Sequence, residues 1–110
     1  MNFQTLSQSN SVDKNRIINA SSWSACLAYL EGAGESISQI SKLRDQVTLL
    51  LPKPNSNICY NVLLKDTDTQ ESSSYVIFQD TFSDLQTWIS QQTGKTVVSI
   101  NMTEKTYVAV

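Results

Sequence analysis

The fold is decided by residues 75–110, which read YVIFQDTFSDLQTWISQQTGKTVVSINMTEKTYVAV. The apolar run 75–78 predicts a buried strand, and the apolar residues of 81–93 recur at helical spacing. Gly94 predicts the end of that helix, because glycine readily takes the left-handed conformation that follows a last helical turn. Apolar and polar residues then alternate towards the last residue, which predicts two further strands.

A fainter copy of this pattern lies about sixty residues earlier in the chain. Trp23, Cys26, Leu27 and Leu30 recur at i, i+3, i+4 and i+7, which predicts an amphipathic helix. The offset between the copies is 59 up to the helix end and 60 beyond it, where the second copy holds one extra residue. The matched pairs are Ile17 with Val76, Ile18 with Ile77, Trp23 with Phe82, Cys26 with Leu85, Leu30 with Ile89, Gly34 with Gly94, Ile37 with Val97, Ile40 with Ile100 and Val47 with Tyr107.

These two copies predict an α+β fold of two ββαββ-like pseudo-repeats, in which two helices pack on antiparallel sheet. The alternative is a chance agreement between two hydrophobic patterns. At 110 residues the chain is expected to form a single domain, with pseudo-repeat halves 1–51 and 58–110. The connector is 52–57, because Pro52 and Pro54 cannot extend a strand ladder.

Local features of each half can also be predicted. Residues 3–8 are a weak strand candidate, and 1–13 as a whole are polar and resemble an arm. The spacing between Ile37 and Ile40 breaks strict alternation, which indicates a β-bulge. A polar hairpin loop is expected at 66–73, and a turn is expected within 101–105.

Uncharged polar residues must form much of the surface of this fold. Ser, Thr, Asn and Gln make up 43 of the 110 residues, whereas charged residues make up 16% and the net charge is −2. Such a surface has a weak electrostatic field, so it neither steers ligands nor repels neighbours strongly. It suits close packing with other subunits, although a genome poor in lysine and glutamate is the simpler explanation.

The sequence offers no convincing catalytic, cofactor-binding or metal-binding set. Histidine is missing, which excludes Ser–His and Cys–His nucleophile systems. Asp80 and Asp84 are explained by the start of the second helix, whose partial positive charge favours carboxylates. Cys26 and Cys59 are expected to be buried thiols, with a single disulfide as the alternative. We therefore expect a protein that is not an enzyme and that binds no cofactor.

Two short motifs resemble parts of ligand-binding loops. Residues 93–96 read TGKT, like the end of a phosphate-binding P-loop, but Ile89 replaces the upstream glycine and the motif closes a helix instead of opening one. Asp66, Asp68 and Glu71 resemble a calcium loop that lacks its glycine and its distal glutamate. A helix end and a solvated hairpin tip explain both motifs better.

Nucleic acid and membranes are not the expected partners. The eight Lys and Arg residues are dispersed, whereas phosphate binding needs a basic stripe. Aromatic residues of the predicted strands offer a weaker alternative, because sheet aromatics can stack on bases. No apolar run approaches the ~18 residues of a membrane span, and the N-terminal residues lack the features of a signal peptide. The strand aromatics are Tyr60, Tyr75, Phe78 and Tyr107.

Contacts with other proteins are the remaining function, and the last strand is the candidate surface. It is apolar and ends without a charged tail, so it can form a sheet edge that pairs with a strand of another subunit. The candidate partner-binding residues are Thr106, Tyr107, Val108, Ala109 and Val110.

As a whole, the chain resembles the small accessory and structural proteins of tailed bacteriophages. It is short, free of histidine, rich in Ser, Thr, Asn and Gln, and predicted to place Trp-bearing helices between strands. The resemblance covers style and composition, and it assigns no functional residue. It implies a virion component or a small host-directed binder, located in the virion or in the host cytoplasm.

Three functions follow, in order of preference. The first is a non-enzymatic structural or assembly protein that forms a homo-oligomer or contacts virion proteins. The second is an anti-defence binder of a host protein or a small ligand, with a pocket near Lys65, Tyr75, Lys95 and Tyr107. The third is nucleic-acid binding.

Overall fold

The computed structural model describes every residue of the chain, Met1–Val110. Eight strands and two helices confirm the predicted α+β class. Neither helix has the length and apolar composition needed to cross a bilayer. The elements are β1 (Asn2–Ser9), β2 (Val12–Asn19), α1 (Trp23–Gly32), β3 (Ser36–Lys42), β4 (Val47–Leu50), β5 (Ile58–Asp66), β6 (Ser72–Phe78), α2 (Phe82–Ser90), β7 (Lys95–Glu104) and β8 (Thr106–Ala109).

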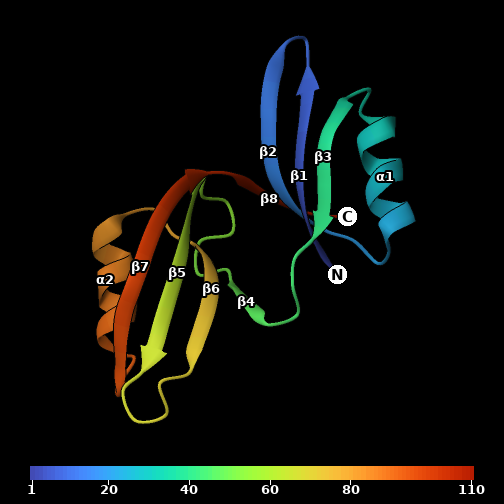
Figure 1. Ribbon diagram of the computed structural model, residues 1–110. Coiled ribbons are helices and arrows are strands. Elements are labelled where there is room, and N and C mark those ends of the chain that lie inside the picture. Colours follow the sequence, from blue (N-terminus) through green and yellow to red (C-terminus); the bar gives the residue numbers. More distant parts are fainter. The chain divides into compact units, whose positions relative to one another are not determined.

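The chain divides into two compact units (Figure 1). The first unit is Met1–Arg44 with Lys105–Val110, and the second is Asp45–Glu104. The chain therefore passes between the units at residues 44–45 and again at 104–105, whereas the sequence places the connector at 52–57. That proline-rich segment belongs to the second unit, where the Lys53 N–H donates to the Phe78 carbonyl over 3.2 Å.

Each unit contains one four-stranded sheet, and the two sheets have the same topology. Their orders are β3-β1-β2-β8 and β7-β5-β6-β4, so equivalent strands take equivalent places. This agreement supports the duplication that the sequence predicts. The fourth strand of each repeat, however, lies in the sheet of the other unit, because β8 pairs with β2 and β4 pairs with β6.

These exchanged strands change the predicted sheet type. The β2–β8 and β4–β6 pairs are parallel, whereas the β1–β2, β1–β3, β5–β6 and β5–β7 pairs are antiparallel. Both sheets are therefore mixed, where the sequence predicts antiparallel sheet. Periodicity does not distinguish the two directions in strands of four residues, because direction depends on which neighbour the strand meets.

A helix covers one face of each sheet (Figure 1). Both helices begin at a hydroxyl cap: Ser22 Oγ accepts from the Ala25 N–H over 3.0 Å, and Thr81 Oγ1 accepts from the Asp84 N–H over 3.1 Å. Apolar side chains between helix and sheet form the core of each unit. The buried core residues are Phe3, Ile18, Ala20, Cys26 and Leu30 in the first unit, and Tyr60, Val62, Leu64, Ile77 and Leu85 in the second.

A β-bulge occurs at the same place in both repeats. The strand register shifts opposite Leu6 and Ser7 in the first sheet, which leaves Ser38 as the extra residue. In the second sheet it shifts opposite Leu63 and Leu64, which leaves Val98. The bulge predicted between Ile37 and Ile40 is confirmed.

The weak strand candidate at 3–8 is confirmed as β1, but the predicted N-terminal arm is wrong, because β1 is an interior strand of the first sheet. A two-residue turn follows it, and positive φ angles at Asn10 (52°) and Ser11 (64°) give the twist that a tight hairpin needs. The alternation of apolar and polar residues is weak in 1–13 because Thr5 and Ser7 are buried. A polar residue at a core position removes the signal on which the sequence argument depends.

Two details near the C-terminus also differ from prediction. The turn expected within 101–105 shrinks to Lys105 alone, because β7 runs through Glu104 and β8 begins at Thr106. The exchanged strands match with an offset of 58, so Leu49 and not Val47 is equivalent to Tyr107. The hairpin loop expected at 66–73 is present, between the end of β5 and the start of β6.

Candidate functional site

The predicted partner strand forms one edge of the first sheet, as β8. Its register places Ile17 beside Tyr107 and Ile18 beside Val108, which packs against the core. Ala109 and Val110 are exposed. The prediction that this segment lies at a sheet edge is therefore confirmed.

One side of β8 keeps backbone groups that point away from the sheet. The Val110 N–H donates to the Asn19 carbonyl of β2 over 2.8 Å. Successive N–H groups alternate in direction along a strand, so the Ala109 N–H points outward. This donor is the kind of group that an added strand engages.

A buried polar cluster lies between the sheet and α1 in the first unit. The Arg16 guanidinium donates from Nη1 to Glu35 Oε1 and from Nη2 to Glu35 Oε2, both over 2.8 Å. The Ser7 hydroxyl donates to the same Oε1 over 2.5 Å. The Arg16 guanidinium also lies 6.0 Å from the ring centre of Tyr29 in α1, and Thr5 Oγ1 is buried without a hydrogen-bond partner. Charge-assisted hydrogen bonds therefore join the side chains of this cluster to one another.

Glu35 is the most strongly perturbed acid in the molecule. The hydrogen bonds from Arg16 lower the pKa of Glu35 from 4.5 to about 2, and the Ser7 hydroxyl adds to this effect while burial opposes it. The hydrogen bond with Glu35 raises the pKa of Arg16. Glu35 therefore stays ionised at neutral pH, and it is not suited to proton transfer there.

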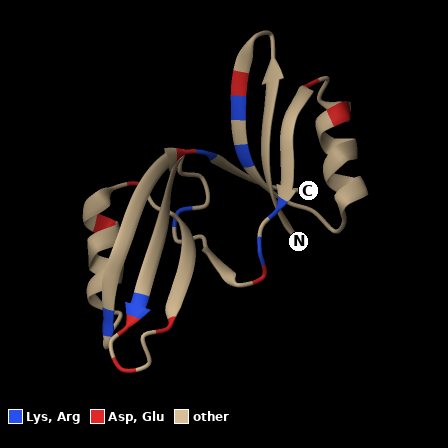
Figure 2. Cartoon of the chain, in the orientation of Figure 1, with Lys and Arg blue, Asp and Glu red and all other residues tan.

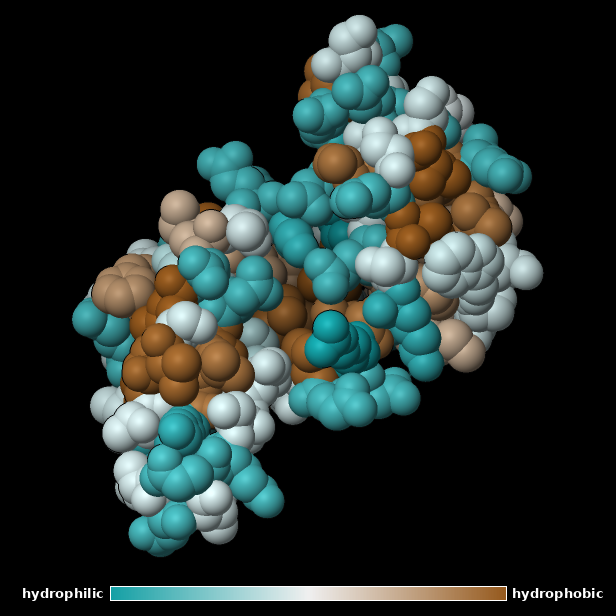
Figure 3. All heavy atoms as spheres, viewed as in Figure 1, coloured by the Kyte–Doolittle hydropathy of each residue, from teal (hydrophilic) through white to brown (hydrophobic).

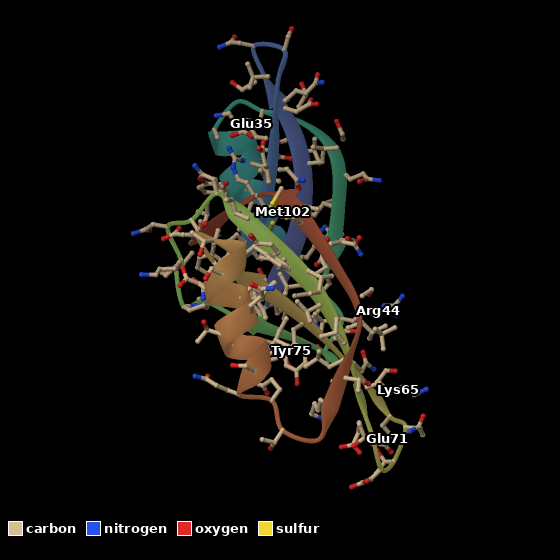
Figure 4. The ribbon with its side chains drawn as sticks, turned by 90° about the vertical axis from the view of Figure 1, so that its left-hand side faces the viewer. Glu35, Arg44, Lys65, Glu71, Tyr75 and Met102 are labelled. Atoms are coloured by element: carbon tan, nitrogen blue, oxygen red, sulfur yellow. The ribbon has the colours of Figure 1, made fainter.

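The second unit fills the same place with apolar side chains. Val62 takes the place of Thr5, and Leu64 takes the place of Ser7. Tyr75 takes the place of Arg16, and Trp88 takes the place of Tyr29. The rings of Tyr75 and Trp88 meet edge to face with their centres 5.0 Å apart, and Figure 4 shows Tyr75 beside α2. The two helix–sheet layers therefore have the same fold, but a polar cluster lies between helix and sheet in the first unit and an aromatic pair lies there in the second.

Sequence reasoning missed the polar cluster. Its signal was present, because the repeat alignment sets Arg16 against Tyr75 at a position that faces the helix. A charged residue at a core-facing position needs a buried partner of opposite charge. The spacing of Ser7, Arg16 and Glu35 along the chain does not show that they meet, since their contact depends on pairing between β1, β2 and the start of β3.

The long edge strands β3 and β7 differ in the side chains that they expose. β7 exposes Val97, Val98 and Met102 by 44%, 53% and 61%. On β3 every exposed side chain is polar, and Ile37 and Ile40 pack against the core. On the face that Figure 3 shows, hydrophobic atoms gather over the strands of the second sheet and also over part of the first unit.

The two ligand-like motifs are part of local turns. Gly94 has a φ of +73° after α2, and its carbonyl accepts from the Thr67 N–H over 3.0 Å. Asp66 Oδ1 accepts from the N–H groups of Asp68 and Thr69, both over 2.9 Å. These hydrogen bonds, that from Thr69 first, lower the pKa of Asp66. No group of three His, Cys, Asp or Glu side chains is arranged to hold a metal ion.

The remaining candidate residues are spread over both units. Tyr75 packs under α2, while Lys65 and Lys95 lie where β5 ends and β7 begins, and Lys95 Nζ is 3.7 Å from Asp66 Oδ2. Tyr107 belongs to the first unit. Cys26 and Cys59 are both buried without a disulfide, as expected, and burial raises the pKa of the Cys26 thiol.

Comparisons of the chain with protein-family models, with curated proteins and with solved structures gave no significant match.

Proposed function

We propose that this chain is a non-enzymatic structural or assembly protein that binds other proteins by adding their strands to its sheet edges. The single observation that supports this most directly is the position of β8, which ends the first sheet and directs the Ala109 N–H outward. Strand addition of this kind gains affinity from main-chain hydrogen bonds and needs no preformed pocket.

The side chains around this edge favour the same function. Residues 106–110 carry no charged side chain that would guard β8, and Val110 is 51% exposed. Natural proteins usually protect edge strands with charge, proline or a covering element, because an open edge pairs with any available strand. The phage-like composition of the chain favours partners among virion proteins or further copies of this protein.

The test uses the full chain with substitutions that alter only the outer side of β8. Ala109→Pro removes the outward N–H while the Val110 ladder bond remains, and proline is tolerated on an edge strand. Val110→Lys adds a guarding charge. The matched control is Val12→Lys, since Val12 is 59% exposed in the same unit but lies at the hairpin end of β2.

Light scattering on the chain alone, and co-sedimentation with tailed-phage particles, measure the association. We expect co-sedimentation with particles, or assembly of copies beyond a dimer, and we expect both β8 variants to weaken this association by tenfold or more while Val12→Lys leaves it unchanged. A single-chain mass at every concentration, combined with no binding to particles, would overturn the proposal.

A further inference from the structure

Because the two repeats have the same topology, the edge strand of one sheet can be compared residue by residue with the equivalent edge strand of the other. β3 and β7 take the same place, beside the interior strands β1 and β5. The register sets Lys42 opposite Phe3 and Met102 opposite Tyr60, so Lys42 and Met102 are structural equivalents. The bulge residues Ser38 and Val98 are equivalent in the same way.

At both of these positions β7 has an exposed apolar residue where β3 has a polar or charged one. Lysine near the end of an edge strand is a common guard against pairing with another chain. At this position β3 has Lys42 and β7 has Met102. Figure 4 labels Met102, whose side chain is 61% exposed.

The charges of β7 stand only at its two ends. Residues 96–103 read TVVSINMT and carry no charge, between Lys95 and Glu104 (Figure 2). The bulge at Val98 lies near one end, so the ladder between β5 and β7 is regular from Ser99 to Glu104. β7 therefore offers a long uncharged edge with one positive and one negative terminus.

We infer that β7 pairs antiparallel with β7 of a second copy of this chain, about a two-fold axis near Ile100. The inference rests on the proposed function and names a partner for another edge of the same molecule. With this axis, Glu104 of one copy lies opposite Thr96 and diagonal to Lys95 of the other, whereas parallel pairing would set like charges side by side.

The apolar residues of this edge are also self-complementary. With the axis near Ile100, Val98 of each copy lies beside Met102 of the other, so the two exposed residues cover each other twice. The dimer joins two four-stranded sheets into one, in the order β4-β6-β5-β7-β7-β5-β6-β4. It leaves β8 of each copy open for another partner.

The decisive variants exchange residues between the two equivalent edges. The double substitution Val98→Ser with Met102→Lys gives β7 the residues of β3, and light scattering should show the dimer dissociation constant raised by at least tenfold. The converse double substitution, Ser38→Val with Lys42→Met, leaves β7 intact, so the dimer formed through β7 should persist. It also makes β3 an apolar edge that can pair with another chain, so oligomers larger than the dimer should form. Both variants alter exposed positions, and circular dichroism checks that the sheets remain.

Chemical cross-linking locates the axis. A short bismaleimide should link Asn101→Cys chains into dimers, whereas the equivalent Ser41→Cys on β3 should give at least fivefold less dimer. The native Cys26 and Cys59 are fully buried, so the reagent labels the introduced thiol.

The outcomes separate this inference from the proposed function. If the chain is a multimer that only the β8 variants disrupt, pairing through β7 is wrong and assembly through β8 stands. If the β7 exchange abolishes the dimer and the β8 variants do not, self-pairing through β7 is supported. A chain that is monomeric at every concentration overturns the inference, even when it co-sediments with particles.

Discussion

Arg16 and Glu35 form a buried bidentate ion pair, with side chains that are only 9% and 3% exposed. The equivalent place in the second unit is filled by Tyr75 against Trp88. The ββαββ architecture therefore does not require an ion pair there. Removing one partner of such a pair is costly all the same, because the other charge is left buried without compensation.

Glu35→Gln should lower the free energy of unfolding of the first unit by about 3 kcal/mol or more, because Arg16 loses its counter-charge. Trp23 belongs to the first unit and packs edge to face on Phe3 at 5.7 Å, while Trp88 belongs to the second. Urea unfolding followed by fluorescence, in Trp→Phe variants that keep one tryptophan, separates the two units.

The control for this substitution is Glu71→Gln, in the exposed loop before β6. It should change the free energy of unfolding by less than about 0.5 kcal/mol, as ordinary surface substitutions do. Equal losses in the two variants would show that the ion pair contributes nothing beyond a surface charge.

Acid should weaken the first unit through Glu35. Its pKa is about 2 in the folded state and 4.5 ordinarily, so the folded state favours the ionised carboxylate. The stabilisation is complete above about pH 5 and is lost as the pH falls through 4.5 towards 2, to a total on the order of 2–3 kcal/mol. Urea midpoints between pH 7 and pH 2 measure it, and the slope should flatten in Glu35→Gln.

Thr5→Val should stabilise the first unit by about 1 kcal/mol. Thr5 is 2% exposed and its hydroxyl oxygen has no hydrogen-bond partner, so the apolar isostere removes a desolvation cost. Val62 occupies the equivalent position, and Val62→Thr should destabilise the second unit by about 1–3 kcal/mol. Denaturant midpoints test both, and a destabilised Thr5→Val would indicate that the hydroxyl has an unseen partner such as water.

Gly94→Ala should cost about 1 kcal/mol, because an alanine is strained at a φ of +73° although no atom lies within 4 Å of its added Cβ. Gly32 is the matched control, since it lies in α1 with ordinary φ and equally open surroundings. Gly32→Ala should be neutral or stabilising by roughly 0.5–1 kcal/mol. Thermal unfolding of the two variants should therefore shift in opposite directions.

Much of the fold follows from the sequence because its signals are local. Hydroxyl caps at Ser22 and Thr81, glycines at the left-handed positions 34 and 94, and the irregular step at Ile37 all specify geometry within a few residues. The duplication reinforced them, since two weak copies of one pattern are harder to produce by chance than one. The helices, the hairpin loop and the bulge were predicted for these reasons.

The exchange of the fourth strands could not be predicted from the sequence, because each of these strands can pair with either of two equivalent partners. Leu50 and Val108 have the same apolar character, and either strand can complete either sheet as far as periodicity can show. The polar cluster could not be predicted from the sequence for a related reason. Ser7, Arg16 and Glu35 lie on separate elements, and their contact is set by strand order and register and not by local pattern.

Strand exchange also fixes the order in which the chain can finish folding during synthesis. All strands of the second sheet lie between Val47 and Glu104, so that sheet can close as soon as this contiguous stretch has left the ribosome. The strands β1, β2 and β3 of the first sheet precede the second sheet in the chain, yet one edge of the first sheet is supplied by 106–109, which follow the second sheet. Hydrogen exchange on chains truncated after Glu104 should therefore show a protected second sheet and a labile first one. The first sheet therefore receives its last strand only after the second sheet can close, and until 106–109 emerge β2 itself is an open edge.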